Sequence, residues 1–375
     1  MRLASLILAN FRSYRHLHVD FGPGVNILYG HNAAGKTNVL ESAFFLATSK
    51  SHRTHLDQEL LTWGESSLAV GGVLDSGYGQ LDAEIRYQAG KRKQLRLGGS
   101  PVRVIDLLGR IPMVFFAPDD LQMLKGSPAL RRRYLDLFLS QTHPRYFTAL
   151  QSYLRVLAQR NGLLRQLREG GGADSTLDVW DEQLVDYAAE VVAYRLEAMK
   201  PVQERARETQ ARLSHGDEKL SLAYLCTAGY AGQTAGDIRD ALRRALQQHR
   251  REDLARAQTT VGPHRDDLQV RLNGVEARSF GSQGQQRSAV LALKLAELAY
   301  LRENLGTAPV LLLDDVTSEL DGGRRSLLLE VVGREAQTFM TCTTLSDMDP
   351  RWLDEARVYR VAVGPAGPDL KVEGR

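Results

Sequence analysis

Residues 30–37 read GHNAAGKT and match the phosphate-binding pattern G-x-x-x-x-G-K-[ST] at every fixed position. In this pattern, backbone N–H groups of the loop and of the following helix surround the phosphates, and the lysine neutralises their charge. We therefore expect Lys36 to neutralise the β and γ phosphates of ATP, and the Thr37 hydroxyl to bind Mg²⁺. The predicted nucleotide-binding residues are Gly30, His31, Asn32, Ala33, Ala34, Gly35, Lys36 and Thr37.

A pair of carboxylates ends the run PVLLLDD at residues 309–315. The apolar residues after Pro309 predict a buried strand, and ligands of parallel sheets lie at the carboxyl ends of the strands. Asp314 is therefore predicted to hold Mg²⁺ together with Thr37, and Asp315 to orient a water. The predicted catalytic residues are Lys36, Asp314 and Asp315.

A second glycine-containing turn, FGSQGQQRSAV at residues 280–290, leads into a run typical of a helix. Ser282 can cap that helix, whose free N–H groups and positive dipole end would attract an anion. The residues that would contact such an anion are Ser282, Gln283, Gly284 and Gln285. A plain glycine-containing turn before a helix is the alternative interpretation of these residues.

The elements that position these residues flank a helical middle. Residues 1–37 predict a strand, a hairpin return, the buried strand VNILY, the loop and a helix, which is the order that a phosphate-binding loop requires. Residues 68–104 alternate like a small antiparallel sheet, and LQVRLNGVEARSF predicts a hairpin around Asn273 and Gly274. The runs PVLLLDD, TFMTCTT and RVYRVAV alternate with helical stretches. We predict an α/β ATPase head with mixed sheets, built from residues 1–117 and 251–375.

Residues 118–250 are predicted to form an inserted helical domain. Two apolar stripes with 3,4 spacing, separated by REGGGADS, indicate a short antiparallel helical hairpin with arms of about 35 Å. Asn161 occupies a polar position in the first stripe and is expected to fix the register of the hairpin. Packing of both helices on the head is the alternative.

Composition excludes several classes of protein. Two cysteines among 375 residues provide neither a disulfide framework nor metal-ligand spacing, which favours a reducing, cytoplasmic compartment. No stretch approaches the ~18 apolar residues of a membrane span. A net charge of +3 does not itself indicate a nucleic-acid partner, so local clustering must carry that argument.

Two segments are locally basic: KRKQLR at residues 91–96, and residues 121–170, which hold nine lysines and arginines against two acids. Such runs are compatible with a solvated face or with salt-sensitive contacts to phosphates. The DNA-binding candidates are Lys91, Arg92, Lys93, Arg131, Arg132, Arg133, Arg155 and Arg160. For GPHRDD at residues 262–267, both a polar turn and a functional role of His264 and Arg265 remain open.

The order GHNAAGKT, GSQGQQR and LLLDDVTSELD resembles the Walker A, signature, Walker B and D-loop motifs of ABC-type ATPases, with residues 318–321 as D-loop. Together with ANFRSY, FFAPDDLQMLKGSPALRRRYLD, LAQRN and VGPHRDDL, these segments resemble the RecF family, which is related to SMC and Rad50 heads. Three departures from the general ABC pattern stand out. Gln283 replaces a signature glycine, Asp315 stands where a glutamate is usual, and Thr343 or Thr344 takes the place of the switch histidine; Gln122 is a weak Q-loop candidate.

The resemblance implies two heads that face each other with two ATP molecules in the interface, each signature contacting the nucleotide of the opposite subunit. It further implies an ATP-dependent homodimer that grips double-stranded DNA near single-strand gaps, hydrolyses ATP slowly, and helps to load RecA with RecO and RecR. The nucleotide-binding subunit of an ABC transporter is an alternative, disfavoured by the long helical insertion and the missing switch histidine. A P-loop kinase is less favoured still, because a signature and a D-loop have no purpose there.

Overall fold

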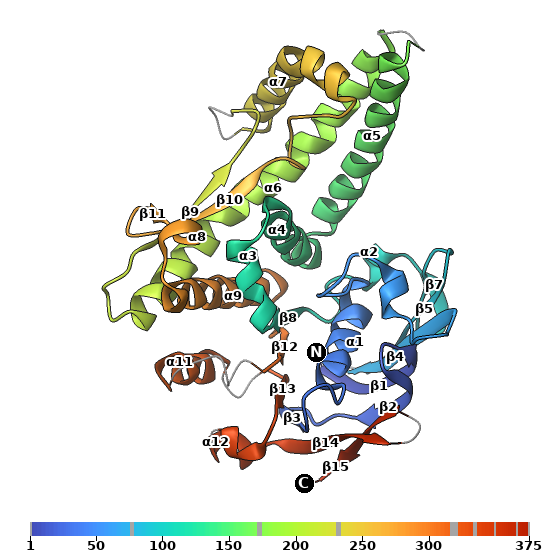
Figure 1. The fold of residues 1–375 in the computed structure, drawn as a ribbon, viewed down its shortest axis with the longest axis vertical. Helices are drawn as coiled ribbons and strands as arrows, with labels where there is room; N and C mark the ends of the chain where they lie inside the picture. Colours follow the sequence, from blue (N-terminus) through green and yellow to red (C-terminus); the bar gives the residue numbers. More distant parts are fainter. Residues whose placement is uncertain are drawn as a thin grey trace. The chain divides into compact units, whose positions relative to one another are not determined.

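The computed structural model describes residues 2–75, 79–170, 175–229, 234–315, 322–332, 336–348, 350–364 and 367–373 (Figure 1). The chain divides into two compact units, one formed by residues 1–120 and 297–375 and the other by residues 121–296. No helix among the described residues is long and apolar enough to cross a membrane.

A six-stranded sheet organises the first unit, in the strand order β15-β14-β3-β13-β12-β8. All neighbours except β15 and β14 pair in parallel. Parallel strands covered on both faces are apolar throughout, and β8, β12 and β13 are completely buried. The strands are β3 (Val25–Tyr29), β8 (Met113–Phe116), β12 (Val310–Leu313), β13 (Thr338–Cys342), β14 (Arg357–Gly364) and β15 (Gly367–Val372).

The second sheet of this unit is antiparallel, in the order β2-β1-β4-β5-β6-β7. Helix α1 (Lys36–Thr48) is buried along most of its length and contacts strands of both sheets. The strands are β1 (Arg2–Phe11), β2 (Tyr14–Asp20), β4 (Ser67–Asp75), β5 (Gln80–Gln88), β6 (Gln94–Leu97) and β7 (Ser100–Val102). The short helices of the unit are η1 (Asp57–Leu60), α2 (Val104–Leu107), η2 (Pro118–Asp120), α11 (Gly322–Val332), η3 (Leu345–Asp347) and α12 (Pro350–Leu353).

Helices dominate the second unit, which also holds the three-stranded sheet β11-β10-β9. The predicted boundary at residue 250 falls inside this unit, because β9 from the helical middle pairs with β10 beyond it. The predicted hairpin turn at Asn273 and Gly274 is confirmed, and both residues have positive φ. The elements are α3 (Leu121–Lys125), α4 (Pro128–Thr142), α5 (Pro144–Arg168), α6 (Ser175–Leu213), β9 (Leu220–Leu225), α7 (Ala235–Arg256), β10 (Asp267–Leu272), β11 (Val275–Glu276), α8 (Ala277–Phe280) and α9 (Gln283–Leu305), whose last turns belong to the first unit.

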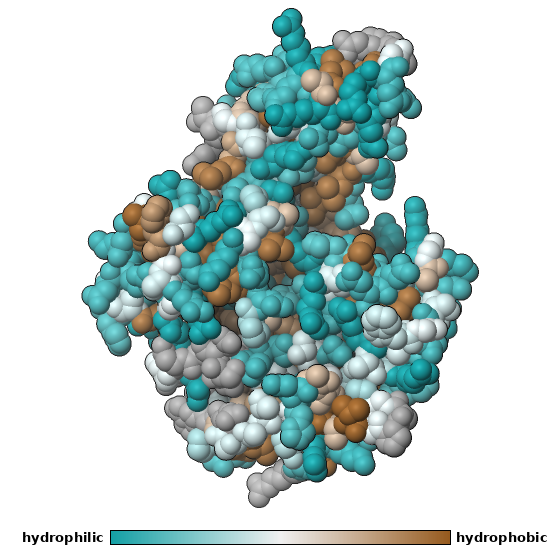
Figure 2. All heavy atoms as spheres, viewed as in Figure 1, coloured by the Kyte–Doolittle hydropathy of each residue, from teal (hydrophilic) through white to brown (hydrophobic). Residues whose placement is uncertain are grey.

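The predicted helical hairpin is formed by α5 and α6, which pack on each other, and α7 packs on both. Leu164 of α5 and Leu177 of α6 are fully buried, while the surface of these helices is largely hydrophilic in Figure 2. Asn161 does not fix the register of this pair as predicted. Its Oδ1 instead accepts hydrogen bonds from the backbone and hydroxyl of Thr259, at 2.7 and 2.8 Å, so it ties α5 to the segment after α7.

Candidate nucleotide-binding site

The GHNAAGKT loop connects β3 to α1 in the first unit. The Gly30 N–H donates to the carbonyl of Cys342 on the neighbouring strand β13, which fixes the start of the loop. Gly35 precedes the helix with φ 105°, a conformation that favours glycine. A Cβ on Gly35 would lie 3.0 Å from the Tyr14 hydroxyl, which itself donates to the Gly35 carbonyl at 3.3 Å. The backbone angle therefore favours glycine here, and a larger residue would also require the Tyr14 side chain to move.

Lys36 bends back over the loop that precedes it. Its Nζ donates to the carbonyls of Gly30 and His31 at 2.6 and 3.0 Å. Burial lowers the pKa of the ammonium, while Asp315, Cys342 and Asp314 oppose that shift. A partly desolvated ammonium interacts strongly with an anion, which suits the predicted contact with phosphate.

Asp314 follows β12 and is placed between two threonine hydroxyls. Its Oδ1 accepts from Thr37 Oγ1 at 2.9 Å and from Thr341 Oγ1 at 2.8 Å. Thr341 lies on β13, the strand between β3 and β12, so its hydroxyl reaches the carboxylate that follows β12. The two predicted magnesium ligands, separated by 277 positions in the chain, are thus directly bonded.

Thr341 was missed by sequence reasoning, which considered only Thr343 and Thr344 in the same run. Its hydroxyl also accepts from the Asp315 N–H at 2.8 Å, and Asp315 has a φ of 50°. One threonine therefore holds the side chain of the first carboxylate and the backbone of the second. The run TFMTC does not alternate, so no linear pattern distinguishes Thr341; its place beside Asp314 results from the parallel pairing of β13 and β12.

The donor set fits magnesium. Burial raises the pKa of Asp314, a shift that the bonds from Thr341 and Thr37 oppose, and a divalent cation would favour the same ionised form. Mg²⁺ prefers oxygen ligands and is usually held by one or two carboxylates plus phosphate oxygens and waters. No group of three or more His, Cys, Asp or Glu side chains suited to a metal occurs among the described residues.

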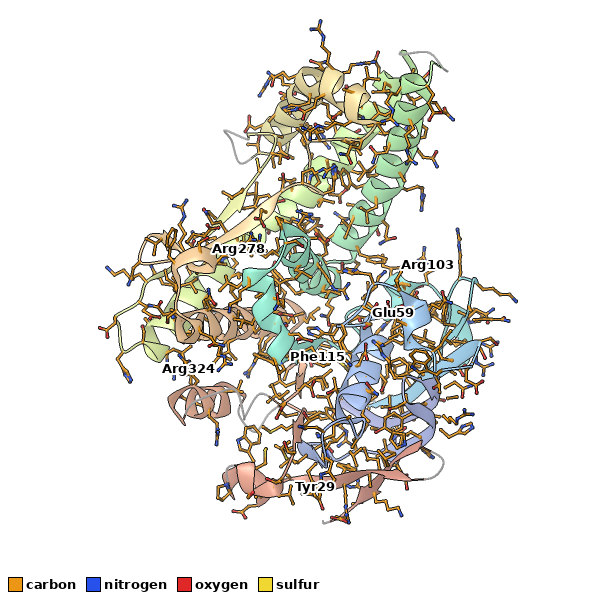
Figure 3. The ribbon with its side chains drawn as sticks, in the orientation of Figure 1. Tyr29, Glu59, Arg103, Phe115, Arg278 and Arg324 are labelled. Atoms are coloured by element: carbon orange, nitrogen blue, oxygen red, sulfur yellow. The ribbon has the colours of Figure 1, made fainter. Side chains whose placement is uncertain are left out.

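The ANFRSY segment supports the first turns of α1. The Arg12 guanidinium forms two bonds with the fully buried Glu41, at 2.9 and 2.7 Å, and Ser51 donates to the same carboxylate. Asn38 donates to Ser13 Oγ at 2.8 Å. These side chains fix the helix that begins at Lys36. Phe115 of β8 and Tyr29 of β3, labelled in Figure 3, belong to the same unit.

The signature turn lies in the second unit and forms a capping box at the start of α9. The Gln285 N–H donates to Ser282 Oγ at 3.2 Å, and the Ser282 N–H donates to Gln285 Oε1 at 2.8 Å. The predicted capping by Ser282 is confirmed, and both Ser282 and Gln283 are exposed. Gln286 donates to the carbonyls of Ala277 and Arg278, the latter labelled in Figure 3, which holds α8 against the turn.

The predicted D-loop, residues 318–321, lies outside the described residues. Gln122 is exposed on α3 of the second unit, and Thr344 bonds to Ser346 in the first. No Q-loop or switch residue is assigned from these positions.

The DNA-binding candidates separate into exposed and engaged side chains. Lys91, Arg92 and Arg155 are exposed. Lys93 instead donates to the Ser49 carbonyl and to the Asp57 carboxylate. Its ammonium also lies over the Phe45 ring. Arg132 donates to the Asp266 carbonyl, and burial lowers the pKa of Arg133.

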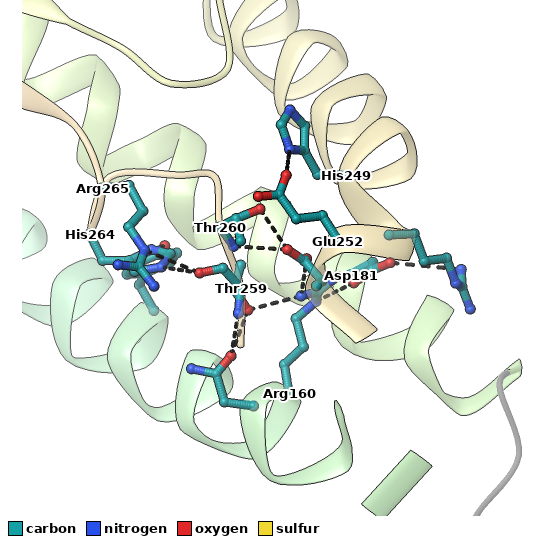
Figure 4. Close-up of polar contacts among 12 residues, drawn as sticks. Arg160, Asp181, His249, Glu252, Thr259, Thr260, His264 and Arg265 are labelled. Carbon is teal, nitrogen blue, oxygen red and sulfur yellow. Dashed lines mark hydrogen bonds and ion pairs between the residues drawn. The ribbon is translucent and has the colours of Figure 1, made fainter. Parts of the chain in front are cut away.

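Arg131 and Arg160 are buried, so the prediction that they contact DNA is wrong. Arg131 is 4% exposed and forms a bidentate pair with Asp267. Arg160 is fully buried and binds Asp181 at 2.6 Å and Asp253 at 2.7 Å (Figure 4). Helical periodicity does not distinguish such an arginine from its exposed neighbours when its partners are remote in sequence.

The GPHRDD segment is part of the same buried network. The His264 ring contacts the Tyr153 hydroxyl and donates to the Thr259 carbonyl, and burial lowers the pKa of His264 to about 4. Asp266 accepts from Tyr224 and Thr227. These contacts support the structural interpretation of the segment over the functional one.

Similarity to known proteins covers nearly the whole chain. Residues 2–360 match the family described as RecF/RecN/SMC N terminal domain. The chain is 43% identical over 366 residues to the DNA replication and repair protein RecF of Heliobacterium modesticaldum, covering 97% of this chain and 98% of that protein. The RecF protein of Symbiobacterium thermophilum is 44% identical over 371 residues, with 97% of each chain covered.

Solved structures give the same relationship. A recombination mediator protein, RecF-ATP in the RecFOR pathway, superposes with a TM-score of 0.90 at 32% identity, covering 99% of this chain and 97% of that one. An Smc head bound to the C-winged helix domain of ScpA gives a TM-score of 0.56 at 15% identity, a similarity of fold alone.

Proposed function

Because the chain belongs to the RecF members of the RecF/RecN/SMC family, we propose that it is an ATP-dependent DNA-binding clamp of recombinational repair. ATP drives two copies together on DNA at single-strand gaps, and slow hydrolysis releases them. In this role the protein helps to load RecA together with RecO and RecR, in line with the RecFOR pathway of its structural relative.

The 2.9 Å hydrogen bond between Thr37 and Asp314 supports the proposed binding of Mg²⁺ and ATP. It brings the end of the phosphate loop and the end of β12 to one point, where a magnesium ion bound by both oxygens would neutralise developing charge on the phosphates. Lys36 holds the phosphates and Asp315 orients the water. Since Asp315 is one methylene shorter than the usual glutamate, hydrolysis is slow enough for a switch.

The signature turn supports the proposed assembly of two copies of this chain around ATP. Ser282 and Gln283 are exposed at the start of a 23-residue helix whose N-terminus attracts anions. This turn completes the nucleotide site of a second copy, so neither site is complete in one molecule.

The proposed clamp is tested by retention of duplex DNA on the full chain, with and without ATP, across a range of salt concentrations. The expected result is retention that requires ATP and falls with salt, and that disappears in Lys36→Ala. Equal retention without ATP, or in Lys36→Ala, would sink the proposal. Transfer of phosphate to a small metabolite without DNA would favour the kinase alternative.

A further inference from the structure

The order of the strands indicates which way a nucleotide would lie across the phosphate loop. β3 leads into the loop, and its neighbours in the sheet are β13 on one side and β14 on the other. Thr341 of β13 and Asp314 after β12 belong to the first side, where Asp314 is bonded to Thr37 and where Mg²⁺ and the terminal phosphates are expected. The nucleoside end of ATP would then point to the opposite side, toward β14.

The end of β14 borders the loop on that side. The strand pairs with β3 up to Tyr29, and its last residues, 361–364, continue past the end of β3. A Cβ on Gly30 would lie 2.2 Å from the carbonyl of Val361, so this extension runs close beside the loop. Val363 follows on the same strand and is 66% exposed. An apolar side chain is thus available on the side toward which the nucleoside would point.

An exposed aromatic ring precedes the signature turn in the second unit. Phe280 ends α8 and is 76% exposed, two positions before Ser282. The Gln286 amide donates to the Ala277 carbonyl at 3.0 Å, and a Cβ on Gly281 would lie 2.7 Å from that carbonyl, so the backbone that carries the ring is braced. A phenyl ring held in water in this way gains free energy when a flat apolar surface covers it.

We propose that Phe280 stacks on the purine base of the ATP held by a second copy of this chain, so that the base lies between Phe280 of one copy and Val363 of the other. Two residues of chain span at most about 7 Å, so a signature turn with Ser282 at the phosphates carries Phe280 within reach of the same nucleotide. The base, and not the phosphates alone, then holds the two copies together. The stack rests on the proposed function, because it exists only in the ATP-bound pair.

The test separates the base from the phosphates by comparing ATP with ribose 5′-triphosphate, which is ATP without its base. Sedimentation velocity gives the dimerisation constant of the full chain at ligand concentrations that saturate the monomer. Wild type is expected to dimerise at least about 25-fold more weakly with ribose 5′-triphosphate, because the dimer loses two stacks worth about 5-fold or more each. Phe280→Ala is expected to lose the same factor with ATP and to show no further loss with ribose 5′-triphosphate.

Two further variants control for position and for the copy that is contacted. Val275→Ala removes another exposed apolar side chain, 52% exposed on β11 of the same unit, and is expected to dimerise as wild type does with both ligands. Phe280→Trp is expected to keep the stack, and ATP is expected to quench its added fluorescence as the dimer forms. This quenching is expected to disappear when Phe280→Trp is combined with Ser282→Arg, which keeps the chain monomeric in the proposed assembly.

Three results would overturn the stack. The first is unchanged dimerisation of Phe280→Ala with ATP. The second is an equal loss in Phe280→Ala with both ligands, which would place the ring against the protein of the second copy and not against the base. The third is quenching in the monomeric double variant, which would assign the ring to the nucleotide of its own copy. A wild type that dimerises equally well with both ligands contradicts the stack alone, whereas a wild type that stays monomeric with ATP contradicts the proposed assembly and the stack together.

Discussion

At the scale of residues, the site depends on one threonine that no motif includes. Thr341 donates to Asp314 and accepts from the Asp315 N–H, so its hydroxyl positions both carboxylates of the candidate site. The loop, Lys36, Thr37 and the two aspartates could be predicted because their order and spacing are fixed by phosphate chemistry. Thr341 could not, because its importance arises from strand order, which a linear pattern does not state.

Thr341→Val is expected to lower the free energy of unfolding by about 1–3 kcal/mol, because the buried carboxylate of Asp314 loses one hydrogen-bond donor and the Asp315 N–H loses its bond to the Thr341 hydroxyl. ATP hydrolysis is expected to fall further than ATP binding, since Asp315 loses its support. Urea denaturation and steady-state hydrolysis measure the two effects.

The matched control is Thr338→Val on the same strand, where the hydroxyl donates to the Ala336 carbonyl and to no other described residue. If both variants lose hydrolysis equally, Thr341 has no special role in holding the carboxylates.

His264 makes stability depend on pH. Burial lowers its pKa to about 4, below the ordinary 6.5, so the unfolded chain binds more protons in this range. The contribution is complete above pH 6.5 and is lost as pH falls toward 4, with an upper limit of about 3 kcal/mol. Unfolding free energies measured between pH 4 and 7 for wild type and His264→Gln give the difference. A constant difference across that range would contradict a neutral buried histidine.

At the scale of elements, the structure confirms the predicted strands, the helical hairpin of α5 and α6, the β-hairpin around Asn273 and Gly274, and the helix after the signature. The fold class is confirmed as well. Period-2 alternation and turn residues specify such elements locally. The prediction that Arg160 contacts DNA was wrong, because its side chain is fully buried. Its partners Asp181 and Asp253 lie on α6 and α7, and their proximity results from helix packing rather than from spacing along α5.

Arg160→Met is therefore expected to lower the unfolding free energy by about 3–5 kcal/mol, because two carboxylates lose their buried partner. Arg155→Met, five positions earlier on the same helix and exposed, is expected to change stability by no more than about 0.5 kcal/mol. Chemical denaturation of both variants measures this. Equal stability of the two variants would mean that the buried network does not hold α5, α6 and α7 together.

At the scale of the whole molecule, the chain carries one complete phosphate loop and one signature turn, in two different structural units. We interpret this division as a design for assembly, in which each molecule binds one nucleotide and completes the site of another. In the clamp that we propose, DNA would be gripped when the dimer forms and released when it is lost.

Sedimentation velocity with ATP tests this interpretation most directly, on wild type, Ser282→Arg and Lys36→Ala. Ser282→Arg leaves the phosphate loop intact but places a bulky cation where the second nucleotide would dock. We expect that wild type dimerises with ATP, that Lys36→Ala neither binds ATP nor dimerises, and that Ser282→Arg binds ATP but stays monomeric. A Ser282→Arg protein that binds ATP and dimerises as wild type does would contradict it.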